Sequence, residues 1–199
     1  LGLRTRLLST DSGIFIFPDH LQLLEYQYSM DRKNPVYIDK TRKNMVVDHF
    51  LITHDSMQIV LDGSLSAFDI NLRNADLTHL NYLLSRDTTI INKGRLNGNV
   101  SYSQDQQLNI NAAIDSLSLY NSNPFSVTVT AVRNENQVPF EFHITNEANK
   151  IDLNGEYFLD NAEVDASLLL DVQNLELFAF LLTGVFEKMN GVLKGETHI

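Results

Sequence analysis

The chain offers few residues whose type and spacing fit a catalytic or metal site. Its histidines are scattered singly along the sequence: His20, His49, His54, His79, His143 and His198. His49 and His54 are five residues apart in a strand-like segment, so we expect them to face opposite sides of a sheet. No His-Glu-x-x-His pattern occurs, and the absence of cysteine removes thiolate nucleophiles, disulfides and Cys-based metal sites. We therefore expect no metal and no other cofactor.

The remaining motifs fit turns better than catalysis. Gly63-Ser64-Leu65-Ser66 lacks the second glycine and the following helix of a nucleophile elbow. The Gly-x-Leu-x-Gly strings that begin at Gly94 and Gly191 lack the spacing of a dinucleotide-binding loop. Carboxylates are numerous, but they fall at expected turns, where a solvated rim explains them better than an acid–base pair does. The sequence therefore predicts a protein that is not an enzyme.

Charge and length narrow the class further. The net charge of -10 argues against a nucleic-acid partner and against tight binding to an anionic membrane surface. No apolar run reaches the roughly 18 residues of a membrane span; the most apolar stretch, Leu175 to Phe186, carries Glu176. The chain begins without Met and stops within an alternating run. We therefore expect a fragment of a larger protein, with targeting signals outside it.

Alternation of apolar and polar residues dominates from about Met57 onward and predicts strands. The strands are separated by short polar turns such as Asn134-Glu135-Asn136-Gln137 and residues 146–149, which is typical of an antiparallel meander with one apolar face. A change of parity near Asp115-Ser116 predicts a bulge. The residues expected to line the apolar face are Ile59, Leu61, Val127, Val129, Phe140, Phe142, Ile151, Leu153, Val164, Leu168 and Leu170.

Two segments, near 76–85 and 174–186, have apolar residues at helical spacing and are predicted to be short amphipathic helices that cover the sheet. Asp76 and Asn174 are the expected N-caps. Within residues 1–44 the pattern is irregular, and Pro18 is expected to confine its strand to an edge or an end. The predicted strands of the N-terminal third are Ile14–Phe17, Leu23–Ser29 and Met45–Thr53.

A repeat emerges from two motifs that recur in the same order. Ile59-Val60-Leu61-Asp62-Gly63 precedes the first helical segment and Gly94-Arg95-Leu96-Asn97-Gly98 follows it. Ile151-Asp152-Leu153-Asn154-Gly155 and Gly191-Val192-Leu193-Lys194-Gly195 bracket the second. Glycine inside a strand points to a bend or a close approach, so these glycines favour a curled sheet. The expected organisation is an unassigned region over 1–44, a first repeat-like unit over 45–103, and further strands with a second unit over 104–199.

The strings that contain these motifs, over residues 45–103 and 149–199, resemble the repeats of the TamB/AsmA-like family of bacterial lipid-transfer proteins. The resemblance implies an all-β, curled antiparallel meander (a β-taco) with an open or half-open apolar groove. It also implies a periplasmic location, an inner-membrane anchor outside this chain, and a role in phospholipid transport or in outer-membrane protein assembly.

Two functions therefore remain open. In the first, the apolar face holds phospholipid acyl chains, and an outer-membrane assembly protein is a possible partner. In the second, the strands close into a β-sandwich that binds protein or carbohydrate in the envelope, although the chain lacks the Trp platforms common in sugar-binding modules. If no lipid covers the apolar face of the isolated chain, we expect two copies to pair through it.

Overall fold

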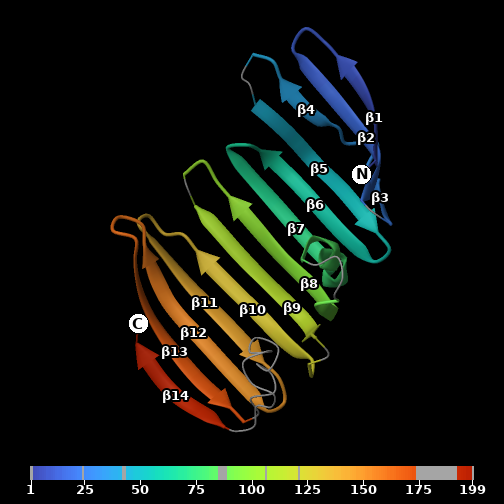
Figure 1. The fold of residues 1–199 in the computed structure, drawn as a ribbon. Coiled ribbons are helices and arrows are strands. Elements are labelled where there is room, and N and C mark those ends of the chain that lie inside the picture. Colours follow the sequence, from blue (N-terminus) through green and yellow to red (C-terminus); the bar gives the residue numbers. More distant parts are fainter. Residues whose placement is uncertain are drawn as a thin grey trace. The chain divides into compact units, whose positions relative to one another are not determined.

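The computed structural model describes residues 2–23, 25–41, 44–84, 89–105, 107–120, 122–173 and 192–198. These residues are all-β, apart from one short helical segment (Figure 1). The chain divides into two compact units. The first unit comprises Leu1–Ala75 and Asn97–Leu108, and the second comprises Asp76–Leu96 and Asn109–Ile199. The predicted repeat boundaries at 44 and 103 concern sequence similarity rather than compactness, and they stay predictions.

The first unit is an antiparallel sheet with the strand order β1-β2-β3-β5-β6-β7. Its strands are β1 (Gly2–Ser9), β2 (Gly13–Leu23), β3 (Tyr26–Met30), β4 (Val36–Asp39), β5 (Asn44–His54), β6 (Met57–Ser64) and β7 (Ala67–Asp76). The short strands β3 and β4 both pair with β2 and β5, so together they fill one strand position. The sequence prediction missed β1 and β4. Every residue of β1 is exposed, so it carries no alternation of apolar and polar residues, and β4 is only 4 residues long.

Pro18 corrects a prediction, because it lies in the middle of β2, which has partners on both sides. On one side β4 pairs with Gly13–Ile16 and β3 pairs with His20–Leu23, so Pro18 falls in the gap between them. On the other side the register with β1 shifts between Arg4 and Thr5. A proline lacks the N–H that a regular ladder requires. The gap and the bulge allow Pro18 to occupy a central strand.

The second unit is a meander in which β9, β10, β11, β12, β13 and β14 pair in sequence order, each antiparallel to the next. In Figure 1 these strands run side by side from light green (β9) through orange to red (β14). Their limits are β9 (Leu108–Leu119), β10 (Phe125–Val132), β11 (Gln137–Thr145), β12 (Asn149–Phe158), β13 (Glu163–Val172) and β14 (Leu193–His198). The remaining strand is β8 (Ile91–Tyr102). Its residues 91–96 belong to this unit and its residues 97–102 belong to the first. The predicted antiparallel meander is therefore confirmed for the described strands.

The predicted bulge and turns of this unit are also confirmed. Ile114 pairs with Val127 and Leu117 with Phe125, which leaves two residues of β9 opposite one of β10. One of those two, Ser116, has a φ of 52°. The turn at Asn134–Gln137 is closed by backbone hydrogen bonds in both directions, at 2.8 and 2.9 Å. The bulge reverses the parity of β9, as the change in the apolar pattern had indicated.

The segment after β7 is a 3₁₀ turn, η1 (Leu77–Leu80), followed by one α-helical turn, α1 (Asn81–Leu84). This corrects the prediction of a single amphipathic helix near 76–85. Asp76 caps the segment as expected, because its carboxylate accepts a hydrogen bond from the Thr78 N–H at 2.9 Å. Asn81 then ties the segment to β8: its side chain donates to the carbonyl oxygen of Ile91 and accepts from the N–H groups of Ile90 and Ile91, at 2.7, 3.0 and 2.8 Å. The helix predicted near 174–186 lies outside the described residues.

The two glycines that end the first repeated motif both lie in hairpin strands, Gly63 one pair from its turn and Gly155 three pairs from its turn. Gly63 of β6 pairs with Phe68 of β7, and Gly155 of β12 pairs with Ala166 of β13. A Cβ on Gly63 would lie 2.8 Å from the Cα of Phe68, and one on Gly155 would lie 2.9 Å from the Cα of Ala166. Both are closer than real Cβ contacts, so each hairpin needs glycine for the close approach of its strands. Gly63 alone has a positive φ, of 108°.

Candidate functional site

The register of the second unit brings nine of the expected site residues onto one face. Residues directly opposite one another in antiparallel strands point to the same side, so each set of pairs forms a row across the sheet. One row runs Ala112, Val129, Phe142, Leu153, Leu168 and Thr197. The next runs Ile114, Val127, Ile144, Ile151, Leu170 and Gly195. Phe140 joins Ala131 and Gly155 in a third row, and Val164 pairs with Tyr157 in a fourth. We call this surface the apolar face; it also includes Ile110, Ala112, Ile114 and Ile144, which were not among the expected site residues.

Burial varies along the apolar face. Val127 and Ile151 are buried, whereas Val164 is 48% exposed. The other expected residues on this face are half-buried: Val129, Phe140, Phe142, Leu153, Leu168 and Leu170. Toward one end, a core forms from Leu77, Ile91, Leu117, Phe125 and Val127, with Val129 and Phe142 packed against it. Leu77 of η1 therefore covers the β9–β10 part of the face.

Ile59 and Leu61 belong to the first unit. Ile59 of β6 lies between Ile52 and Leu72, and Leu61 lies between Phe50 and Ile70. Both are half-buried, and Phe50 is 4% exposed. They therefore belong to an apolar face of the first unit, whereas the other nine expected residues belong to the second.

The opposite face of the second unit is polar and contains a charge cluster that the sequence analysis did not identify. His143 of β11 pairs with Asp152 of β12, and the His143 Nδ1 lies 2.7 Å from the Asp152 Oδ1. The Lys150 Nζ lies 2.6 Å from the Asp152 Oδ2, and Glu141 lies 3.7 Å from the other imidazole nitrogen. The Asp152 side chain is only 8% exposed. We call these four residues the Asp152 cluster; the alternation places them on the polar face, but only the register shows that they meet.

The two partners of Asp152 set its ionisation. Burial raises the pKa of the Asp152 carboxyl, and the hydrogen bonds and positive charge of Lys150 and His143 more than offset this, so the pKa lies below the ordinary value of 3.8. The carboxylate thus stays ionised within a strand face that is solvated elsewhere. This arrangement stabilises the sheet through ion pairs across and along strands.

The histidines and serines considered for catalysis have structural partners. The His49 Nδ1 lies 3.6 Å from an oxygen of Asp62, and the His54 Nδ1 lies 2.7 Å from the carbonyl oxygen of Gln27. The rings of Tyr26 and Tyr28 flank His54, at 5.6 and 5.1 Å between centroids. Ser64 contacts the hydroxyl of Ser66 across the β6–β7 turn. Within the described ranges, no group of three or more His, Asp or Glu side chains is arranged to hold a metal ion.

Comparison of the chain with protein-family models, with curated proteins and with solved structures finds no match. The TamB/AsmA-like resemblance therefore rests on the sequence motifs alone. In the described part of the chain, no helix has the length and apolarity required to cross a bilayer.

Proposed function

We propose that the chain is a non-catalytic part of an envelope protein and that the apolar face of its second unit binds phospholipid acyl chains. The observation that carries the proposal is the alignment of apolar side chains in neighbouring rows over β9–β13. Acyl chains have no polar groups to recognise, so a continuous apolar surface is the feature that binds them. Each Å² of apolar surface removed from water contributes roughly 25 cal/mol.

The proposal takes the sheet of the second unit as a curled, half-open groove, in which the segments near 76–85 and 174–186 act as amphipathic covers. It places the protein in the periplasm, with an inner-membrane anchor outside this chain. Its role is phospholipid transport or outer-membrane protein assembly, as in the TamB/AsmA-like proteins that the motifs resemble. The close approach of the partner strand at both Gly63 and Gly155 supports the same reading.

The alternative, a closed β-sandwich that binds protein or carbohydrate, requires two facing sheets. The described strands β9–β14 form one hydrogen-bonded series instead. Val164 is also 48% exposed at a position that a second sheet would cover. Both observations favour the groove.

Two adjacent leucines of β13 provide a matched test. Leu168 belongs to the apolar face, whereas Leu169 pairs with Asp152 and Glu196 on the polar face and is 41% exposed. We expect a photo-crosslinking amino acid at position 168 to label phospholipid added as vesicles, and the same residue at position 169 to label it at least about fivefold less. Mass spectrometry of the irradiated protein measures both yields. Equal labelling at the two positions would contradict acyl-chain binding at this face.

A further inference from the structure

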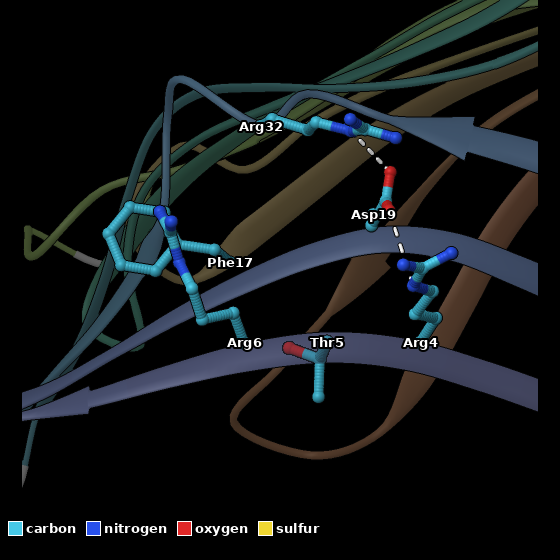
Figure 2. A pocket seen from close by; sticks show the side chains of 6 residues that line it. All are labelled: Arg4, Thr5, Arg6, Phe17, Asp19 and Arg32. Carbon is cyan, nitrogen blue, oxygen red and sulfur yellow. Dashed lines mark hydrogen bonds and ion pairs between the residues drawn. The ribbon is translucent and has the colours of Figure 1, made fainter.

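A cavity of about 430 Å³ in the first unit gathers three arginines (Figure 2). Two arginines come from β1, one comes from the loop between β3 and β4, and β2 supplies an aromatic ring and a carboxylate. The lining residues, here called the arginine pocket, are Arg4, Thr5, Arg6, Phe17, Asp19 and Arg32. The acyl-chain proposal involves none of them.

The bulge between β1 and β2 brings these side chains together. Arg4 pairs with His20 and Thr5 pairs with Pro18, so Asp19 has no direct partner in β1. A bulge changes the direction of the side chains beside it. In Figure 2 the Asp19 carboxylate lies between the guanidinium groups of Arg4 and Arg32. The bulge that accommodates Pro18 therefore also builds the pocket.

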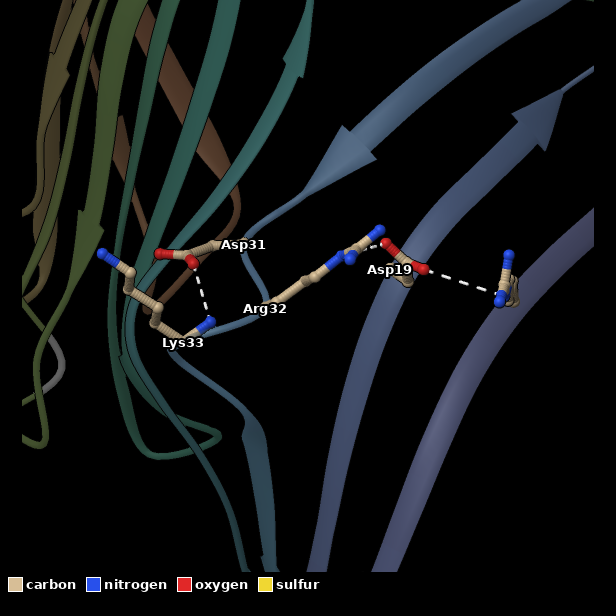
Figure 3. Close-up of polar contacts among 5 residues, drawn as sticks. Asp19, Asp31, Arg32 and Lys33 are labelled. Atoms are coloured by element: carbon tan, nitrogen blue, oxygen red, sulfur yellow. Dashed lines mark hydrogen bonds and ion pairs between the residues drawn. The ribbon is translucent and has the colours of Figure 1, made fainter.

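The Asp19 carboxylate contacts two of the guanidinium groups in this pocket. The Arg32 Nε donates a hydrogen bond to the Asp19 Oδ1, and the Arg4 Nε lies 3.7 Å from the Asp19 Oδ2. The neighbouring acid, Asp31, accepts instead from the N–H of Lys33 at 2.8 Å, and Figure 3 shows it directed away from Asp19. The pocket thus contains three guanidinium groups and one carboxylate, which contacts only Arg4 and Arg32, in a chain whose net charge is -10.

Arg6 carries the charge that Asp19 does not balance. Its Cζ lies 4.6 Å from the centroid of the Phe17 ring, a cation–π contact that orients the guanidinium plane. Among the described residues, no carboxylate lies within ion-pair distance of Arg6. Guanidinium groups bind the oxygens of a phosphate through paired N–H donors. The net negative charge of the chain does not oppose this locally, because charges beyond about 10 Å are screened at 0.1 M salt.

We propose that the arginine pocket binds a phosphate group, either as a free anion or within a phospholipid headgroup. Arg6 is the principal ligand, and Asp19 positions Arg4 and Arg32 beside it. The binding is salt-sensitive, because the side chains of Arg4 and Arg32 are 82% and 74% exposed. This site is distinct from the apolar face and stands without it.

Titration of the chain with inorganic phosphate at constant ionic strength tests the proposal. The signals to follow are the side-chain Nε–H resonances of the arginines. We expect saturable shifts of the pocket arginines and roughly three- to tenfold weaker binding in Arg6→Gln. Arg73→Gln is the control, because it removes the same charge from an exposed position on β7 of the same unit. Non-saturating shifts, or equal affinity in Arg6→Gln and Arg73→Gln, would show only general attraction to a cationic surface and overturn the proposal.

A short-chain phosphatidylglycerol, kept monomeric, distinguishes the two sources of phosphate. If the unmodified chain binds this lipid more tightly than it binds inorganic phosphate, and Arg6→Gln removes the difference, the ligand is a lipid headgroup. Equal affinity for the two probes identifies the phosphate group alone, and absence of both interactions rejects the site. Crosslinking of lipid at Leu168 in the Arg6→Gln variant reports separately on the apolar face, so either proposal can fail without the other.

Discussion

Asp152 shows how one side chain links two strands on a face that is otherwise exposed to solvent. Its carboxylate contacts His143 of the neighbouring strand and Lys150 of its own strand, and only 8% of the side chain is exposed. Removing one partner of a buried hydrogen-bonded charge leaves the other groups unsatisfied, which costs about 1–3 kcal/mol. The Asp152 cluster therefore contributes to stability in a way that the exposed pairs of the same face do not.

The lowered pKa of Asp152 predicts how its contribution depends on pH. Because the pKa is lower in the folded chain than the ordinary 3.8, the contribution is present above about pH 4 and is lost as the pH falls through the folded pKa. We expect Asp152→Asn to lower the free energy of unfolding at pH 7 by about 1–2 kcal/mol. We also expect the variant to lose less stability than the unmodified chain between pH 5 and pH 3.

Denaturant unfolding at each pH measures both effects of the Asp152 substitution. Asp171→Asn is the matched control, because Asp171 pairs with Lys194 on the same face but its side chain is 50% exposed. Its effect at pH 7 should be clearly smaller. Equal effects of the two substitutions would mean that burial of the Asp152 cluster adds nothing.

At the level of the strands, Gly155 makes a sharp prediction about how closely β12 and β13 approach. A Cβ at this position would lie 2.5 Å from the carbonyl oxygen of Asp165 and 2.7 Å from the Cβ of Ala166. Gly155→Ala must therefore push the two strands apart, and we expect it to destabilise the chain by about 1–3 kcal/mol. Gly195 of β14 is the control, because a Cβ there meets nothing within 4 Å.

Thermal unfolding of Gly155→Ala and Gly195→Ala measures the difference. Gly195→Ala should be neutral or slightly stabilising, because alanine restricts the unfolded chain more than glycine does. A Gly155→Ala variant as stable as Gly195→Ala would show that the hairpin has room for a side chain. The close approach would then not explain why the motif repeats.

The sequence predicted the strands from Met57 to Val172 well, because one face of most of them is buried or half-buried and the period of two is visible. The bulge at Asp115–Ser116 was predicted from the same signal, a change of parity within one strand. β1 was missed because it is exposed on both faces. Pro18 was misplaced because its position depends on where three other strands begin and end, which no local pattern encodes.

The candidate sites also differ in how far a local sequence pattern can predict them. Parity alone selected the residues of the apolar face, because residues in one row must share a face whenever neighbouring strands are in register. The Asp152 cluster and the arginine pocket depend on which residues of different strands stand opposite one another. Asp19, for instance, contacts Arg32 from a loop 13 residues away. Such pairs become visible only with the register and the bulge.

For the molecule as a whole, the size of the apolar face of the second unit decides what it requires. Five strands spaced about 4.8 Å apart (β9–β13), crossed by two complete rows about 6.7 Å apart, give a face of roughly 300 Å². Exposed apolar patches of this size on a monomer are often functional. The core that contains Leu77 covers the part formed by β9 and β10 and reaches Phe142 and Ile144 of β11. Among the described residues of this face, Leu153, Leu168 and Leu170 are half-buried and Val164 is 48% exposed, and these are expected to contact lipid or a second copy of the chain.

If lipid and a second copy of the chain compete for the apolar face, removing lipid should change the oligomeric state. We expect the chain purified with bound phospholipid to be a monomer and the delipidated chain to form dimers as its concentration rises, because pairing buries the face that the lipid had covered. Sedimentation velocity over a concentration series, with native mass spectrometry for bound lipid, measures both states.

Val129→Asp places a charge at the centre of the face and should reduce both lipid retention and dimerisation. Thr128→Asp, on the exposed opposite side of the same strand, should affect neither. A delipidated chain that stays monomeric at every concentration and retains no lipid would instead favour a core closed by the chain itself, as in the sandwich alternative.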